Sequence, residues 1–202
     1  MQIILTNVGK RYNREWIFRH ISQSFSAGKK YAITGPNGSG KSTLLQVIAG
    51  SLTFTEGDIG CMLNNQPVNE NLYQHISIAA PYLELIEEMT ADEFLTFHSS
   101  FKPLTANNSE ILQTVHLENA ANKQIRYFSS GMKQRLKLAQ AFFSSVPVLL
   151  LDEPTTNLDI EGIALYRLLI EKYTDGKLVI ISSNDRQEYD FCDEVVSIPS
   201  FK

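Results

Sequence analysis

The sequence YAITGPNGSGKST at residues 31–43 decides the fold that we expect for this chain. An apolar strand over residues 31–34 runs into a glycine-rich loop, and a helix with apolar periodicity follows over residues 42–49. The string G-x-x-x-x-G-K-S between a strand and a helix is typical of a phosphate-binding loop. We favour this interpretation over an ordinary glycine-rich turn because the motif stands in the context that it requires.

The residue types of this loop fit a polyphosphate ligand. Backbone N–H groups reach phosphate oxygens only where no side chain intervenes, which accounts for Gly35, Gly38 and Gly40. Lys41 supplies a flexible cation for the β- and γ-phosphates, and the Ser42 hydroxyl is suited to ligate Mg²⁺. The helix that follows adds the partial positive charge of its N-terminus. The nucleotide-binding residues predicted here are Gly35, Pro36, Asn37, Gly38, Ser39, Gly40, Lys41, Ser42 and Thr43.

A second apolar run ends in two carboxylates. Residues 148–154 read VLLLDEP, the pattern expected of a buried strand that delivers acids to the carboxyl edge of a parallel sheet. We predict that Asp152 holds Mg²⁺, mostly through water, and that Glu153 polarises the attacking water. An isolated Asp-Glu pair is commonly only a polar strand exit, but a phosphate loop upstream favours the catalytic interpretation.

Further apolar runs extend the predicted sheet. They are nearly continuous rather than alternating, which is typical of parallel strands covered on both faces. The strand-like runs lie at residues 3–5, 30–34, 76–79, 148–151 and 178–182. The sequence therefore predicts an α/β fold.

The long connection between the third and fourth of these runs carries helical signals. A capping box at residues 90–93 opens a stretch over 94–100, Ser109 opens a second over 111–118, and a third runs over 132–144. We expect Phe94, Phe97 and Phe101, at i, i+3 and i+7, to form the buried face of the first helix. The chain is then one domain over residues 1–202, with a core over about 1–81 and 146–202 and a helical subdomain over about 82–145.

Composition narrows the classes of function. The chain has 202 residues, 43% hydrophobic and 20% charged, as ordinary globular proteins have. A net charge of −4 without a basic run argues against nucleic acid as a partner. Two cysteines form no disulfide framework, and the sequence shows no signal peptide or membrane span. We expect a cytoplasmic protein that reaches the membrane only through a partner.

Residues 127–135, YFSSGMKQR, resemble the signature sequence of the ATP-binding cassette (ABC) ATPases, LSGGQ followed by x-Q-R. The segment stands just before the carboxylate strand, where that family keeps it. Residues 157–159, Asn-Leu-Asp, resemble the D-loop of the family, and Tyr12 lies where the aromatic residue that stacks on adenine is expected. The resemblance covers the whole chain.

The resemblance implies an architecture and an assembly. It implies a phosphate-loop, RecA-like α/β core with a mostly parallel sheet, an N-terminal antiparallel β portion and an inserted helical subdomain. It also implies ATP and Mg²⁺ as cofactors and a head-to-tail homodimer or heterodimer. Each ATP would lie between the phosphate loop of one protomer and Ser129, Ser130 and Gly131 of the other. The expected partner is a separately encoded transmembrane permease subunit.

Two positions depart from the family pattern. Pro81 stands where the family has a glutamine that contacts magnesium and water, and Asn184 stands where it has a histidine. We assign catalytic roles to Glu153 and Asn184. The Asn184 amide can donate a hydrogen bond to a γ-phosphate oxygen, although it cannot take up a charge or a proton as histidine does. The alternative is that Asn184 caps the stretch from Arg186 onward.

Two functions of different classes remain open from the sequence. The first is an ATP-hydrolysing subunit of an ABC transporter. The second is an ATP-gated regulatory or assembly subunit that hydrolyses weakly because Pro81 and Asn184 replace groups of the reactive site. Glu153 favours the first.

Overall fold

A parallel sheet forms the centre of the computed structural model, which describes residues 1–68 and 71–198. The sheet has five strands in the order β6-β7-β8-β3-β9, and every pair in it is parallel. Its strands are β3 (Lys30–Thr34), β6 (Ile76–Ala79), β7 (Val148–Asp152), β8 (Leu178–Ser182) and β9 (Glu194–Ser197). The α/β core that the sequence predicts is therefore confirmed.

The N-terminal part forms a second sheet. It has the order β2-β1-β4-β5 and is antiparallel throughout. Its strands are β1 (Gln2–Tyr12), β2 (Glu15–Ser26), β4 (Glu56–Leu63) and β5 (Gln66–Pro67). The expected N-terminal antiparallel portion is confirmed, but the interpretation of residues 3–5 as a parallel strand covered on both faces is wrong. These residues belong to a long strand that a hairpin turn joins to β2, so the pairing is antiparallel.

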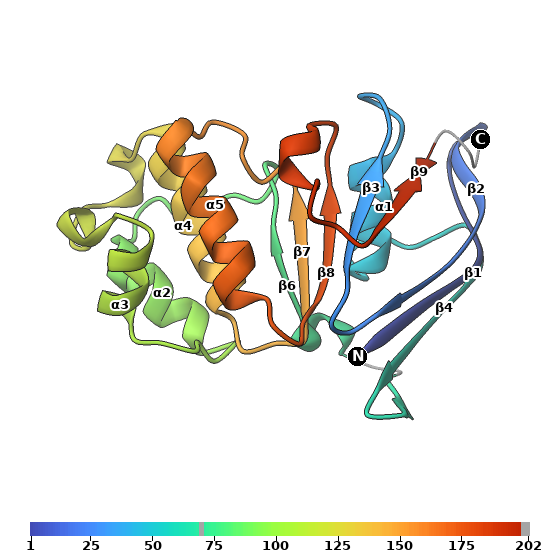
Figure 1. The fold of residues 1–202 in the computed structure, drawn as a ribbon, viewed down its shortest axis with the longest axis horizontal. Coiled ribbons are helices and arrows are strands. Elements are labelled where there is room, and N and C mark those ends of the chain that lie inside the picture. Colours follow the sequence, from blue (N-terminus) through green and yellow to red (C-terminus); the bar gives the residue numbers. More distant parts are fainter. Residues whose placement is uncertain (69–70, 199–202) are drawn as a thin grey trace.

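Three helices lie between β6 and β7, and Figure 1 shows them to one side of the sheet. They are α2 (Ala91–Ser99), α3 (Asn108–Thr114) and α4 (Ser130–Phe143). Thr90 and Glu93 form the capping box of α2, as the sequence predicts. The second helix begins earlier than predicted because Asn107, rather than Ser109, is its cap: Asn107 and Glu110 exchange the two capping hydrogen bonds.

The remaining elements are helical and connect or cover the sheets. They are α1 (Lys41–Ile48), α5 (Ile160–Tyr173) and the 3₁₀ turns η1 (Leu72–His75), η2 (Glu118–Ala120), η3 (Ile125–Tyr127) and η4 (Arg186–Glu188). In the part of the chain that the structure describes, no helix is long and apolar enough to cross a membrane.

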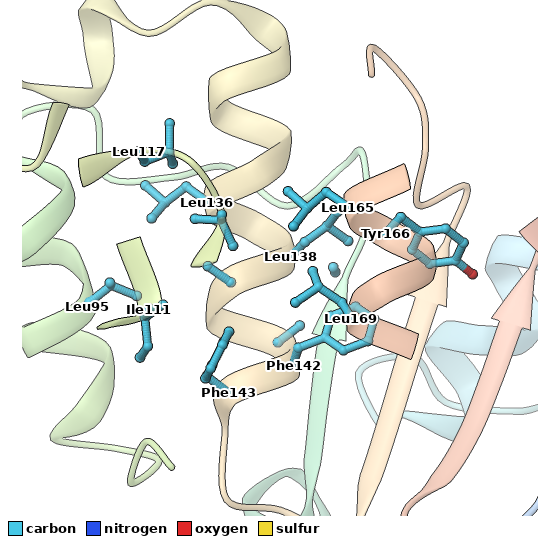
Figure 2. Close-up of a cluster of buried hydrophobic side chains, with 14 of the residues drawn as sticks. Leu95, Ile111, Leu117, Leu136, Leu138, Phe142, Phe143, Leu165, Tyr166 and Leu169 are labelled. Atoms are coloured by element: carbon cyan, nitrogen blue, oxygen red, sulfur yellow. The ribbon is translucent and has the colours of Figure 1, made fainter. Parts of the chain in front are cut away.

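Two apolar clusters lie on opposite faces of the parallel sheet. Leu149 and Leu151 of β7 join the cluster that includes side chains of α2, α3, α4 and α5. Leu150 joins the cluster under α1 and the antiparallel sheet. Figure 2 shows the first cluster, with side chains of α4 and α5 packed together. Burying one such leucine stabilises the fold by about 1.5–3 kcal/mol. This double burial explains why the strands are nearly continuously apolar.

The expected aromatic face of α2 is only partly correct. Phe94 is buried, but Phe97 is 42% exposed and Phe101 is 69% exposed. Their rings meet edge to face, 5.1 Å between centroids. The helix ends at Ser99, so Phe101 lies beyond it and the spacing of i to i+7 does not apply.

Candidate nucleotide-binding site

The segments of the site leave one edge of the parallel sheet. The phosphate loop follows β3, Asp152 ends β7, and Asn184 follows β8. These strands are neighbours, and their register places Asp152 beside Ser182. Carboxyl ends of parallel strands meet at one edge, which lies toward the top of Figure 1. Segments far apart in the sequence are therefore brought together here.

The phosphate loop has a backbone that only glycine adopts readily. Gly40 has φ 102°, and a Cβ added there would lie 2.4 Å from Cγ2 of Ile17. Gly40 also precedes α1 without any side-chain cap, and the first turn of α1 holds no acidic residue. The first N–H groups of α1 are thus free to bind an anion.

Lys41 is the buried cation of this loop. Its Nζ donates hydrogen bonds to the carbonyl oxygens of Gly35 at 2.9 Å and Pro36 at 3.4 Å. Ser39 is buried as well, and its Oγ has no hydrogen-bond partner. The loop therefore folds around its own ammonium group, which places a positive charge among the backbone amides.

A cavity of about 250 Å³ joins the phosphate loop to Glu153. Its lining residues are Ile17, Asn37, Gly38, Gly40, Lys41, Ser42, Thr43 and Glu153. Most of the loop residues predicted from the sequence thus face one cavity, while Gly35, Pro36 and Ser39 stand behind it. Ile17 was missed, because nothing in its local sequence indicates that β2 reaches the loop.

Asp152 has the surroundings of a carboxylate that needs a cation. It is buried at the end of β7, and its Oδ1 has no hydrogen-bond partner. A buried carboxylate oxygen without a partner is costly unless a metal ion or donor satisfies it. Within residues 1–68 and 71–198, no group of three or more His, Cys, Asp or Glu could hold a metal. The oxygen donors of Asp152 and Ser42 are of the kind that Mg²⁺ prefers, and Mg²⁺ keeps water and phosphate as most of its ligands.

Glu153 is held in an unusual backbone conformation. Its φ is 43°, in the left-handed region that side chains other than glycine seldom adopt. Its N–H donates to the carbonyl oxygen of Ser182 at 2.8 Å, which ties the residue to β8. Such strain persists only where the surrounding structure enforces it, and it is common at reactive sites.

Asn184 contacts the phosphate loop directly. Its Nδ2 donates to Oδ1 of Asn37 at 2.6 Å. The alternative role as a helix cap is wrong, because Asp185 is the cap of η4 and accepts a hydrogen bond from the N–H of Gln187. The capping side chain must stand immediately before the first turn, and Asn184 lies one residue too early.

The signature residues form a second cavity, of about 370 Å³. Its lining residues are Ser129, Ser130, Gly131, Met132, Arg135, Asn157, Leu158 and Asp159. None of them lines the phosphate-loop cavity. Figure 1 shows the start of α4 well apart from the loop between β3 and α1. One chain therefore does not bring the signature to its own phosphate loop.

The signature helix is tied to the segment that follows Glu153. Gln134 is buried, and its Nε2 donates to the carbonyl oxygen of Pro154 at 2.7 Å. Arg135 pairs with Asp159 at 3.3 Å. Both residues belong to the x-Q-R that follows the signature in the sequence. The motif alone does not indicate which groups Gln134 and Arg135 contact.

Tyr12 stands at the end of β1 with its ring 47% exposed. The ammonium group of Lys10 lies 4.9 Å from the ring centroid. Tyr12 does not line the phosphate-loop cavity. The stacking of Tyr12 on adenine therefore stays a prediction.

Comparison with known proteins agrees with this geometry. The family model described as ABC transporter matches residues 18–156. The uncharacterized ABC transporter ATP-binding protein YybJ of Bacillus subtilis is 31% identical over 189 residues, which cover 92% of this chain and 87% of that protein. The chain belongs to the ABC transporter family.

Other members of the ABC transporter family match the chain over most of its length. The lantibiotic transport ATP-binding protein SrtF of Streptococcus pyogenes is 31% identical over 198 residues, with 89% of this chain and 79% of that protein covered. A putative ABC transporter ATP-binding protein of Pyrococcus furiosus has the same fold, with TM-score 0.84, 21% identity and full coverage of both chains. A dimeric ATP-binding cassette bound to ADP and Pi gives TM-score 0.78 at 26% identity, covering 96% of this chain and 93% of that one.

Pro81 lines a different cavity from the phosphate loop of this ABC chain. Glu84 is exposed and lies beside Lys137, so it does not replace the family's glutamine at the cavity. Tyr82 is the nearby polar group: partial burial, and then the charge of Asp152, raise the pKa of its hydroxyl to about 12. A phenol that stays protonated can donate a hydrogen bond but repels no carboxylate.

Proposed function

We propose that this chain binds MgATP and hydrolyses it as the energy-supplying subunit of a membrane transporter. The observation that carries the proposal is the shared cavity of the phosphate loop and Glu153. A cation, free backbone amides and a carboxylate that faces them are the groups that phosphoryl transfer to water needs.

Each group in or beside the cavity has a distinct role in this proposal. Lys41 and the first N–H groups of α1 bind the β- and γ-phosphates. Ser42 and Asp152 would hold Mg²⁺, which when bound supplies charge that neutralises the phosphates. Glu153 orients the attacking water and accepts its proton, and Asn184 donates a hydrogen bond toward the γ-phosphate.

We place a second cassette opposite the first, head to tail. The signature cavity shares no lining residue with the phosphate-loop cavity of the same chain, so a partner cassette would complete the site. The start of α4 would then direct its N-terminus and small side chains at the γ-phosphate of the opposite nucleotide. A separately encoded transmembrane subunit would use the resulting closure and opening to move its cargo.

A second candidate is an ATP-gated regulatory or assembly subunit that hydrolyses slowly. Pro81 and Asn184 favour it, since Pro81 has no polar side chain to contact magnesium or water and Asn184 cannot take up a proton as histidine does. In this case nucleotide binding still pairs the cassettes, but turnover is weak. Only a measured rate separates the two candidates.

The deciding experiment compares Glu153→Gln with the wild type and with the control Glu171→Gln, an exposed glutamate on α5. Loss of the base should lower ATP turnover by about 10²–10⁴-fold. Binding of MgATP should persist, and the variant should accumulate as a nucleotide-bound dimer on gel filtration. A Glu153→Gln variant as active as wild type would overturn the role of Glu153. A wild type that pairs on ATP without measurable turnover would favour the second candidate.

A further inference from the structure

A buried carboxylate lies behind the reactive site. Glu188, in the 3₁₀ turn η4, is only 3% exposed. No Lys, Arg or His pairs with it among the residues that the structure describes. Burying a carboxylate without a cation costs free energy unless hydrogen bonds compensate, and simple packing would be served better by an apolar side chain.

Two donors of Thr155 hold the side chain of Glu188. Its Oε1 accepts from the N–H of Thr155 at 2.7 Å and from the Thr155 hydroxyl. The backbone carbonyl of Glu188 accepts from the Tyr166 hydroxyl at 2.7 Å, which anchors the turn to α5. Burial raises the pKa of Glu188, whereas hydrogen bonds from Ser183 and Thr155 oppose that rise.

Thr155 begins the segment that leaves the catalytic glutamate. It lies two residues after Glu153 and two before Asn157, both of which have left-handed backbones. The turn itself closes through the N–H of Thr156 on the carbonyl of Glu153 at 3.1 Å. The N–H of Thr155 is therefore one of the groups through which the rest of the protein holds this turn, together with the N–H of Glu153 on Ser182 and the carbonyl of Pro154 on Gln134.

Glu188 also belongs to the segment that carries Asn184. A cavity of about 280 Å³ separates the two segments. Its lining residues are Asn37, Glu153, Thr155, Thr156, Ser183, Asn184, Asp185 and Glu188. One carboxylate thus joins the loop of the proposed base to the loop of the proposed γ-phosphate donor.

We infer that Glu188 is a positioning residue for ATP hydrolysis: by holding Thr155 it keeps the Glu153 carboxylate at a fixed distance from Asn184. This inference rests on the proposed function. Because Glu188 does not line the phosphate-loop cavity, its loss should change the rate of the chemical step and leave nucleotide binding unchanged.

The test measures kcat, KM and MgATP affinity for Glu188→Ala, Glu188→Gln and the neighbouring exposed control Gln187→Ala. Glu188→Ala should lower kcat by about 10–100-fold with KM and affinity within about twofold. Glu188→Gln should recover most of kcat, because its amide oxygen still accepts from the N–H of Thr155. Gln187→Ala should behave as wild type. A purely structural role predicts a lower melting temperature with unchanged kcat, and this result would overturn the inference.

A second variant covers the case in which Glu188→Ala does not fold. Thr155→Val removes the hydroxyl donor and keeps the shape, so it should lower kcat several-fold at constant KM. If Thr155→Val turns over like wild type, the inference fails. If only this inference fails, Glu153→Gln still loses activity. If the proposed function fails, Glu153→Gln remains active.

Discussion

The phosphate loop and the signature segment are both built on the first turn of a helix, and they differ in what that turn leaves free. Gly40 begins α1 without a side-chain cap, and Lys41 adds a buried cation. Ser129 caps α4 by accepting from the N–H of Met132 at 3.2 Å. The nearby cation, Arg135, already pairs with Asp159. The first turn of α1 is therefore suited to bind an anion within one chain, whereas the first turn of α4 offers only small side chains and a partial charge.

We therefore propose that the two segments act in separate steps. The phosphate loop brings a buried cation and uncapped helix N–H groups to one cavity, which suits it to bind a nucleotide within a single chain. The signature segment offers less charge, so we expect it to act on a nucleotide that another chain already holds. Variants in the two segments should accordingly separate binding from turnover.

The largest effect on nucleotide affinity is expected at Lys41. Lys41→Ala removes the only side-chain ammonium that lines the described phosphate-loop cavity. Charge-assisted hydrogen bonds contribute about 1.5–3 kcal/mol each, so MgATP affinity should fall by about 100-fold. Calorimetry measures the affinity, and the exposed Lys172→Ala serves as the control. Undiminished affinity in Lys41→Ala would show that the loop has been misread.

Gly131→Asp should lower turnover rather than MgATP affinity, in contrast to Lys41→Ala. A Cβ there would lie 3.1 Å from the carbonyl oxygen of Asn157, so the substitution is tight but requires no left-handed backbone. Aspartate in the first turn suits the helix, but it opposes phosphate across a dimer interface. Turnover should fall by about 10–100-fold while the affinity of the single chain for MgATP stays within about twofold. Lost affinity in dilute monomer would contradict the separation of the two sites.

The smallest effect is expected on the pH dependence of stability, at His98 in the helical subdomain. Burial, and then the charge of Lys102, lower the pKa of His98 to about 4, and its Nε2 contacts the Ser144 hydroxyl at 2.9 Å just after α4. The folded state thus favours the neutral imidazole. Its stabilising contribution is complete above the unfolded pKa of about 6.5 and is lost as pH falls toward 4.

Acidification from pH 7 to 4.5 should therefore lower the free energy of unfolding by about 1–2 kcal/mol through His98, after allowance for its partial exposure. His98→Gln should remove this part of the pH dependence, and the control His75→Gln should keep it. Urea unfolding at the two pH values measures the difference. An equal pH dependence in His98→Gln and wild type would exclude His98 as its source.

Local sequence predicted the phosphate loop, the carboxylate strand and the helical connection because each depends on neighbouring residues. Gly40, Lys41 and Ser42 are contiguous, and one turn of backbone brings them together. The same reasoning failed where the ends of an element were misjudged. Phe101 lies beyond the end of α2, and residues 3–5 are part of a longer hairpin strand. Periodicity predicts which side chains share a face of a helix or strand, but not where that helix or strand ends.

Contiguous residues were therefore enough to indicate the fold class, the family resemblance and the chemistry of the loop. Folding decided which distant groups meet. The hydrogen bonds from Asn184 to Asn37 and from Thr155 to Glu188 join residues 147 and 33 positions apart. No local pattern encodes such pairs, because the sheet register and the ends of β3, β7 and β8 bring them together. Tertiary structure also placed the signature away from the phosphate loop, since α4 packs on the opposite face of the sheet from α1.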